Sequence, residues 1–246
     1  MAQSGVGRIR LFEDFFAEDN IANTATDRAF GNFTVAGQGS EVADSGIPLL
    51  HADAISGVGV MTTTNEDNHT ILVGTPVAFD VGLMGTIVAE TRVRFVDLDT
   101  KEGFFGFTDI DPSTLSLETD VLTGATTTLT LTASDICGFY LSAELSDDED
   151  WHTVYNGGTT TGETDSTELD ASDDAVAGEW QVLRLEVMPN GTTYWYIDGV
   201  LKQTVVAACS TTTDMAVCLA AAANTTEFAI MDGDYLEVTA NRDWPV

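Results

Sequence analysis

The stretch from Gly178 to Val206 constrains the fold most, because it combines strict alternation with two turn signals. Apolar side chains occupy every second position from Leu183 to Val187, a period of two that predicts a strand with one buried face. Asn190-Gly191 follows as a turn in which we expect two consecutive residues of positive φ, and Asp198-Gly199 marks a second turn. The pattern predicts a three-stranded antiparallel meander.

Three further patterns extend this interpretation to the rest of the chain. Thr86–Phe95 alternates with all its charges on one side, and we expect it to pair with the glycine-broken aromatic run Glu102–Thr108 through a turn at Asp97–Lys101. The first strand, Arg8–Phe15, is expected beside the last, Tyr235–Arg242, with Arg8 and Arg10 facing Glu237 and Asp234.

The remaining segments are also expected to form strands and loops, with little helix. The alanine content of Asp214–Ala222 favours a helix by propensity, but among so many strands it is interpreted as a buried central strand. Leu115–Thr132 is expected to be a loop with one strand, and residues 156–175 a mobile acidic loop. The other expected strands lie around Asn32–Ala36, Gly57–Thr63, Ile71–Thr75, Val77–Phe79, Asp135–Ala143, Trp151–Tyr155 and Phe228–Met231.

Two sequence phrases resemble a known family. W-x-x-L-R-L-E-V…G-T-x-x-W-Y-I-D-G spans residues 180–199, and A-E-T-R-V-R-F…G-F-F-G-F-x-D spans residues 89–109. Both are similar to strands of concanavalin A-like jelly rolls, the fold of legume lectins, laminin G modules and family 16 glucanases. The resemblance implies an all-β, antiparallel β-sandwich of jelly-roll type. With 246 residues, a single domain covering 1–246 is expected.

The charge balance restricts the partners. Forty acidic residues face nine basic ones, giving a formal net charge of −31. A field of this sign repels nucleic acid and anionic membranes, so neither is expected as a partner. A solvated, solubilising surface explains the charge most simply; binding of a basic partner or of divalent cations is the alternative. No stretch has the length of a membrane span, and the N-terminus lacks the apolar core of a signal peptide, so synthesis in a cytoplasm without cleavage is expected.

Candidate catalytic side chains are sparse. Family 16 glucanases use two carboxylates on one strand in an E-x-D-x-x-E pattern, and Glu163-Thr164-Asp165-Ser166-Thr167-Glu168 matches those letters. It lies in a Gly/Thr-rich loop without a strand context, so a chance match is the favoured interpretation and no catalytic residue is assigned. The three histidines form no metal or triad motif; they are His51, His69 and His152.

Metal, cofactor and disulfide sites are not expected either. Acidic pairs and runs offer oxygen ligands for calcium, as in lectins and laminin G modules, but a solvated acidic turn is the favoured interpretation; they are Asp97/Asp99, Asp109/Asp111 and Asp147–Asp150. Cys137, Cys209 and Cys218 are expected to be free and buried, with a Cys209–Cys218 pair as the alternative.

Aromatic residues in the meander provide a possible ligand surface. Tyr194 and Tyr196 alternate with Trp195, so only one set can face solvent, and Trp195 is expected in the core. Trp151, Trp180 and Trp244 fit either the core or its rim.

Three functions fit these patterns. The opening G-R-I-R-L-F-E-D-F-F resembles the start of bacteriophage virion proteins, which implies a non-enzymatic capsid decoration (cement) protein. Its partners would be the major capsid protein and further copies of itself, as a homo-oligomer such as a trimer located in the virion. The alternative is a carbohydrate-binding, lectin-like module with glycans as partners. A glycoside hydrolase or lyase is the second alternative.

Overall fold

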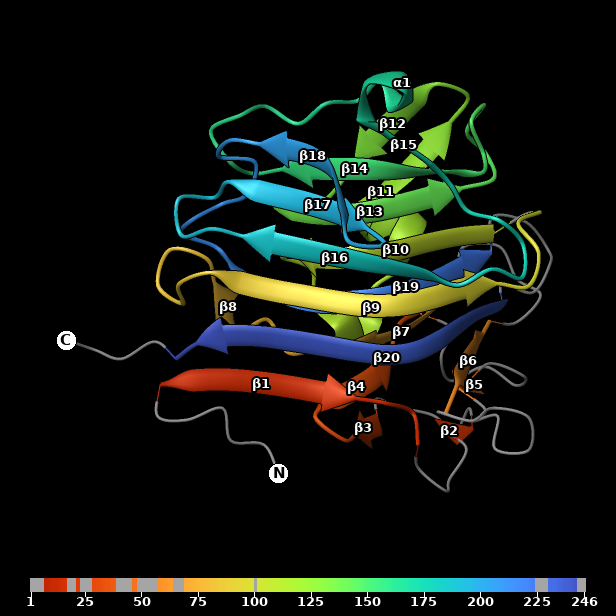
Figure 1. Ribbon diagram of the computed structural model, residues 1–246, viewed down its shortest axis with the longest axis horizontal. Helices are drawn as coiled ribbons and strands as arrows, with labels where there is room; N and C mark the ends of the chain where they lie inside the picture. Colours follow the sequence, from red (N-terminus) through yellow and green to blue (C-terminus); the bar gives the residue numbers. More distant parts are fainter. Residues whose placement is uncertain are drawn as a thin grey trace.

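Two antiparallel sheets packed face to face make up the computed structural model (Figure 1). The structure describes residues 7–16, 21–22, 28–38, 46–47, 57–63, 69–99, 101–223 and 230–242. The first sheet, sheet A, has the spatial order β18 (Val200–Val205), β17 (Thr193–Ile197), β16 (Gln181–Val187), β9 (Ile87–Phe95), β20 (Ile230–Asn241), β6 (Gly59–Thr62), β5 (Gly46–Ile47) and β2 (Ile21–Ala22), with β1 (Arg8–Glu13) beside β20.

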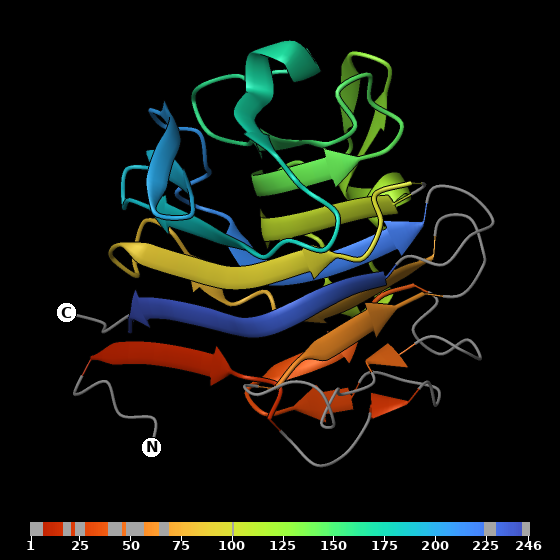
Figure 2. The same ribbon diagram turned by 45° about the vertical axis from the view of Figure 1, so that its right-hand side comes forward.

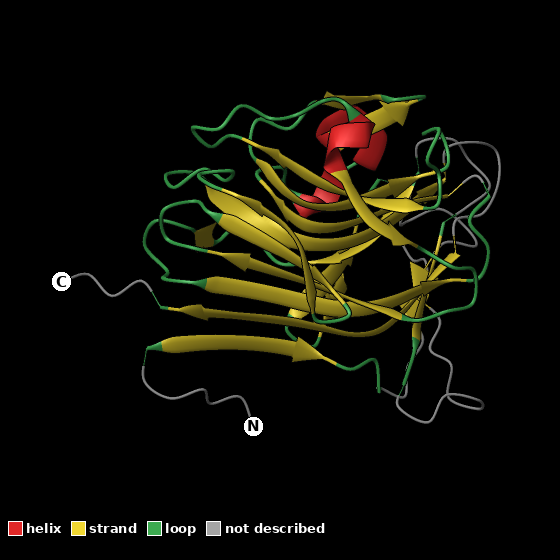
Figure 3. Ribbon diagram, turned by 45° about the horizontal axis from the view of Figure 1, so that its top comes forward, coloured by secondary structure: helices red, strands yellow, loops and turns green. Residues whose placement is uncertain are grey.

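The second sheet, sheet B, lies behind the first in Figure 1. Its order is β15 (Asp170–Asp174), β14 (Asp150–Asn156), β13 (Ile136–Ser142), β10 (Lys101–Thr108), β19 (Asp214–Ala223), β7 (Thr70–Gly74), β4 (Phe33–Ala36) and β3 (Arg28–Phe30), with β8 (Phe79–Asp80) beside β19. Strands account for nearly all regular structure (Figure 3). The predicted all-β sandwich is confirmed, and so is the strand assignment of the alanine-rich segment, which forms β19.

Alternation builds the core between the sheets. In β9 every second residue from Ile87 to Phe95 is buried, while the residues between them are half-exposed. Phe95 and Phe139 pack on Trp151 with ring centroids 6.1 and 6.2 Å away. Trp195 is fully buried, as predicted, and its indole Nε1 donates to the carbonyl oxygen of Gly138 on the opposite sheet at 2.8 Å. This bond satisfies the one polar group of a large buried side chain.

The first and last strands lie side by side, as the sequence predicted (Figure 2). β1 pairs with β20 so that Arg10 lies opposite Thr239 and next to Glu237. The predicted three-stranded meander is also present as β16, β17 and β18. The pairing of β1 with β20 places Arg8 and Arg10 of β1 at the margin of the outer face of sheet A.

The expected pairing of β9 with β10 is wrong. β9 pairs with β16 and β20 in sheet A, whereas β10 pairs with β13 and β19 in sheet B, so the turn at Asp97 crosses between the layers. The burial of each strand explains this: β9 has one exposed face, but every residue of β10 is buried. Gly106 allows β13 to approach, since a Cβ there would lie 2.4 Å from the Cα of Gly138.

Two local expectations are also corrected. Asn190 does not have positive φ; only Gly191 does, and Asn190 instead uses its side-chain oxygen to accept a bond from the Thr192 N–H. Asp198 and Gly199 are the pair in which both residues have positive φ. The two short final strands are one strand, β20, with an irregularity between Gly233 and Tyr235.

Two segments expected as loops contain regular structure. Residues 112–131 form a 3-10 turn, η1 (Pro112–Thr114), a π-helical turn, η2 (Leu117–Val121), and a hairpin of β11 (Leu122–Ala125) and β12 (Thr128–Leu131), where one strand was expected. The acidic loop 156–175 contains α1 (Ser166–Leu169) and the edge strand β15.

Residues 112–131 cover the outer face of sheet B. Every residue of β7, β10 and β13 is buried, which requires that both faces of these strands be covered. The N–H of Leu117 donates to the hydroxyl of Thr70 at 2.8 Å, and this bond ties the cover to β7. The opposite sheet has no such cover over its central strands in the described chain, so sheet A presents the accessible strand face.

Candidate functional site

The exposed face of sheet A gathers basic, acidic and aromatic side chains from five strands. Of the nine basic residues in the chain, Arg10, Arg92, Arg94 and Arg184 occupy outward positions on β1, β9 and β16. Four of the nine basic residues therefore lie on one strand face of a protein whose net charge is −31. We call this surface the sheet A face; it comprises Arg10, Phe12, Glu90, Arg92, Arg94, Trp180, Arg184, Glu186, Tyr194, Tyr196, Asp232, Asp234, Tyr235 and Glu237.

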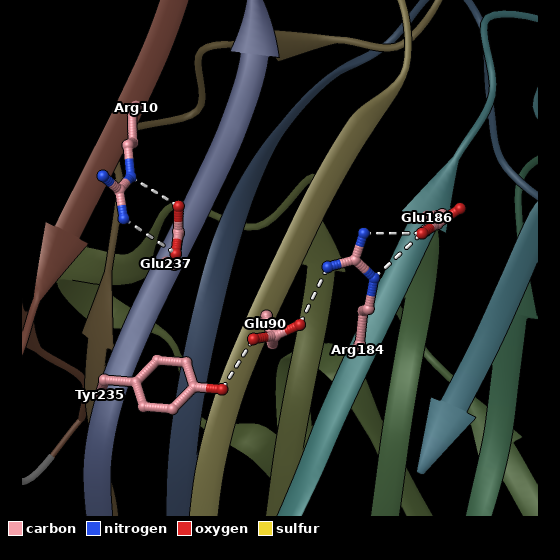
Figure 4. A network of polar contacts seen from close by, with 6 residues as sticks. All are labelled: Arg10, Glu90, Arg184, Glu186, Tyr235 and Glu237. Atoms are coloured by element: carbon pink, nitrogen blue, oxygen red, sulfur yellow. Dashed lines mark hydrogen bonds and ion pairs between the residues drawn. The ribbon is translucent and has the colours of Figure 1, made fainter. Parts of the chain in front are cut away.

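Glu90, near the middle of β9, is the hub of a polar network across three strands (Figure 4). Its Oε1 accepts a 2.7 Å bond from the hydroxyl of Tyr235 on β20. Its Oε2 accepts a 2.9 Å bond from Nη1 of Arg184 on β16. Arg184 also donates from Nη2 to Glu186 at 2.7 Å, so N–H groups on two edges of its planar guanidinium are engaged. Each side chain is therefore held in one orientation before any ligand arrives.

Three more arginine–carboxylate pairs flank this network. Arg10 pairs with Glu237 (Figure 4), with 2.6 Å between Nε and Oε1, and Nη1 of Arg92 lies 2.9 Å from Oδ2 of Asp234. The Nε of Arg94 donates to Asp232 at 2.9 Å. The sequence predicted an arginine of β1 beside Glu237, whereas Asp234 pairs with β9 instead. These pairs fix the guanidinium groups and leave their remaining N–H donors for other partners.

Aromatic rings lie among these charges. The guanidinium carbons of Arg92 and Arg94 lie 4.8 and 4.7 Å from the ring centroid of Trp180, within the range of cation–π attraction. Tyr194 and Tyr196 are half-exposed on β17, the latter directly opposite Arg184. Trp180, for which the sequence left core and rim open, is half-exposed at the rim of this face.

The electrostatics of the network keep its donors protonated. Burial, the hydrogen bond to Glu90 and the charge of Glu90 all raise the pKa of Tyr235 above its usual range. For Arg184, burial acts to lower the pKa, but the hydrogen bonds to Glu90 and Glu186 raise it overall. At neutral pH the face therefore presents a phenol, charged guanidinium groups and carboxylate acceptors within hydrogen-bonding reach of one another.

Replacing the hub tests whether the network is a connected unit. We expect Glu90→Ala to lower the free energy of unfolding by about 1–2 kcal/mol, because Tyr235 and Arg184 both lose an acceptor in a half-buried site. Glu186→Ala, which removes one partner of Arg184 only, should cost less than about 0.5 kcal/mol. Urea denaturation of both variants measures the difference. Equal losses in the two variants would contradict a hub at Glu90.

The acids of the hydrolase-like motif are used to shape a turn. Glu163 Oε1 accepts bonds from the backbone N–H groups of Thr164 and Asp165. Asp165 caps α1 by accepting from the N–H of Thr167 at 3.1 Å. Glu168 is exposed on the same short helix. The structure does not bring these carboxyl groups together over a strand face.

The other acids considered as calcium ligands also have local roles. Asp97 lies 3.3 Å from Lys101, Asp111 caps η1 through Ser113, and Asp147 lies 3.1 Å from the buried His152. Hydrogen bonds from the N–H and hydroxyl of Ser113 lower the pKa of Asp111. Within the described ranges, no three His, Cys, Asp or Glu side chains converge in a way that could hold a metal ion.

The remaining candidates lie mostly away from the sheet A face. Trp151 is buried and donates to Gln181 at 2.9 Å, and the three cysteines are free and buried. Cys209 neighbours Cys137, whose hydrogen bond, with burial, raises the Cys209 pKa well above its usual range. His69 immediately precedes β7. His51 and Trp244 lie outside the described residues.

Comparison with solved structures decides the fold. The chain aligns over 91% of its length with 94% of the Emp47p carbohydrate recognition domain, at a TM-score of 0.57 and 9% identity. It aligns with a protein of unknown function from Shewanella oneidensis MR-1 (100% and 91% covered, TM-score 0.59, 12% identity). An endo-β-1,4-glucuronan lyase from the fungus Trichoderma reesei also matches (93% and 94% covered, TM-score 0.52, 11% identity).

The fold is a concanavalin A-like jelly roll. At these low sequence identities, the concanavalin A-like neighbours establish only the architecture of this chain. No protein-family model matches the chain, and neither does any curated protein. Among the described helices, none has the length and apolar character needed to span a bilayer.

The sheet A face itself was missed at the sequence level. The sequence predicted an arginine of β1 beside Glu237, but it did not connect Glu90 to its partners, because Arg184 and Tyr235 are 94 and 145 positions away from it. The available signal was the concentration of arginines at outward positions of two predicted strands.

Proposed function

We propose that this protein is a non-enzymatic carbohydrate-binding module that uses the sheet A face of its lectin-like fold. The observation that carries the proposal is the ordered network centred on Glu90, bordered by half-exposed Trp180, Tyr194 and Tyr196. Sugar rings offer hydroxyl groups that both donate and accept, and apolar C–H faces that pack on aromatic rings. Fixed carboxylates, guanidinium groups and rings on one strand face match both features.

Two further observations support this choice. Structural neighbours include the Emp47p and Emp46p carbohydrate recognition domains, so the same fold is used for sugar recognition elsewhere. The outer face of sheet B is covered by residues 112–131, whereas the sheet A face is accessible. A hydrolase would require paired acids over an open groove, and the motif at 163–168 is engaged in turn and cap bonds instead.

The sequence-based expectation of a capsid decoration protein stays a prediction. Its partners, the major capsid protein and further copies of the chain in a homo-oligomer, and its location in a virion are likewise untested. The carbohydrate recognition domains among the neighbours favour the carbohydrate-binding alternative.

A glycan array followed by calorimetry tests the proposal. The wild-type protein should bind at least one class of glycan saturably. We expect Trp180→Ala and Tyr196→Ala each to weaken that binding at least tenfold, because each removes a ring that would pack on the sugar. Phe16→Ala is the matched control, since Phe16 is 64% exposed and lies outside the face. A flat array, or equal losses in all three variants, would overturn the proposal.

A further inference from the structure

A cavity of about 450 Å³ opens at one end of the sheet A face, above the end of β20. Arg8 and Arg10 of β1 line one side, Thr86 lines the other, and Thr239 and Asn241 are the polar groups of β20 within it. This volume is at the lower end of the range seen for small-molecule sites.

Backbone geometry fixes the shape of this cavity. The N–H of Asn241 donates to the carbonyl of Met84 at 2.9 Å, which ties the end of β20 to the segment before β9. Gly85 has φ +69°, and a Cβ there would lie 2.3 Å from Nδ2 of Asn241. The positive φ favours glycine at this position, and the absence of a side chain leaves room for the amide of Asn241 beside the turn.

The lining of the cavity is locally basic, although the protein as a whole is acidic. The net charge of −31 opposes a polyanion at long range, but about 0.1 M salt screens that repulsion beyond about 10 Å, whereas the arginines of the lining act at contact distance. None of its seven described lining residues is acidic, although forty acidic residues are present in the chain. Arg10 is held by Glu237 through Nε at 2.6 Å and Nη2 at 3.4 Å, so its Nη1 retains donors for another acceptor. The guanidinium of Arg8 lines the same space, and two hydroxyls and an amide add neutral donors and acceptors.

We propose that this cavity binds the anionic substituent, a carboxylate or a sulfate, of an acidic polysaccharide whose chain continues along the sheet A face. This inference rests on the proposed function. Guanidinium groups bind carboxylates and sulfates with paired, charge-assisted hydrogen bonds, and the hydroxyl and amide groups suit the neighbouring sugar hydroxyls. The Arg10–Glu237 pair connects the cavity to Phe12 and Tyr235 of the face, which stack with ring centroids 6.2 Å apart.

Calorimetry with defined oligosaccharides at fixed ionic strength tests this inference. The probes are hexagalacturonate for carboxylates, a κ-carrageenan hexasaccharide for sulfates, cellohexaose as the neutral sugar, and inorganic sulfate alone. The variants are Arg8→Gln and Arg10→Gln. Lys202→Gln is the matched control, since it changes the net charge equally but lies on β18, paired with Asp173. Arg8→Gln leaves the Arg10–Glu237 pair intact, and urea denaturation of both arginine variants separates a loss of ligand binding from a change in the sheet.

We expect one acidic oligosaccharide to bind wild type at least tenfold more tightly than cellohexaose. Arg8→Gln and Arg10→Gln should each remove most of this preference, and Lys202→Gln should retain it. Which acidic probe binds identifies the substituent. Equal binding of acidic and neutral sugars overturns the inference while leaving the proposed function in place. No binding of any of the three sugars overturns the inference, and a flat glycan array in addition overturns both. Inorganic sulfate as tight as the oligosaccharide, or an equal loss in Lys202→Gln, also overturns the inference.

Discussion

Raising the pH through neutrality is expected to destabilise the protein by roughly 3–5 kcal/mol through one carboxyl group, Glu102. Glu102 is fully buried on β10, beneath residues 112–131, and its Oε1 accepts bonds from Tyr140 and Ser142. Burial, followed by the charge of Glu118, raises its pKa from 4.5 to about 8. The folded protein thus holds a proton here that the unfolded chain has lost.

The sign follows from the raised pKa. Below pH 4.5 both states bind the proton, and the contribution of Glu102 to stability is fully present. Between 4.5 and about 8 only the folded state keeps it, so the free energy of unfolding falls by about 1.4 kcal/mol per pH unit. Above about 8 the loss is complete. Asp150, whose pKa is raised to about 7 mainly by burial, contributes in the same direction but less, because it is only partly buried.

The Glu102→Gln variant isolates this effect. Glutamine keeps an acceptor for Tyr140 and Ser142 and resembles the protonated acid, so we expect a change of less than about 1 kcal/mol at pH 5. At pH 8.5 the variant should be more stable than wild type, and its profile between those values should be flatter. Urea denaturation across pH measures both curves, with Asp150→Asn as the comparison. Parallel curves for wild type and Glu102→Gln would contradict a neutral buried Glu102.

The second large effect concerns the core. Trp195→Ala is expected to lower the free energy of unfolding by about 3–5 kcal/mol, because it leaves a cavity between the sheets and removes the bond to the carbonyl of Gly138. The adjacent Tyr196→Ala removes an outward ring and should cost less than about 1 kcal/mol. Urea denaturation of this pair compares the two faces of one strand. Similar losses at the two positions would contradict the assignment of Trp195 to the core.

Local patterns predicted the elements of this fold better than their neighbours. Alternation alone placed the inward and outward residues of β9 and β16, because the period of two is a property of the strand itself. Pairing depends on contacts that sequence proximity does not reveal. β9 and β10 are consecutive, yet they lie in different sheets, because the fully buried β10 requires strands on both edges and cover on both faces.

The candidate site shows the same limit. The outward charges of β9 were recognised, but the partners that order them lie on β16 and β20, which only the sheet order brings beside β9. Residues 115–132 were expected to be a loop with one strand, because their alternation is weak; the structure instead has short turns and a hairpin in residues 112–131. Their role as a cover follows from packing on Thr70 and the buried β10, which no local pattern encodes.

Amide chemical-shift mapping with the glycan that binds best tests the central claim most directly. If the sheet A face binds carbohydrate, the largest shifts on titration should fall on β9, β16, β17 and β20, centred on Glu90, Arg184 and Tyr235. Residues 112–131 and α1 should change little. Shifts concentrated on that cover, or on the loops at 157–165, would contradict the assignment of the ligand to sheet A.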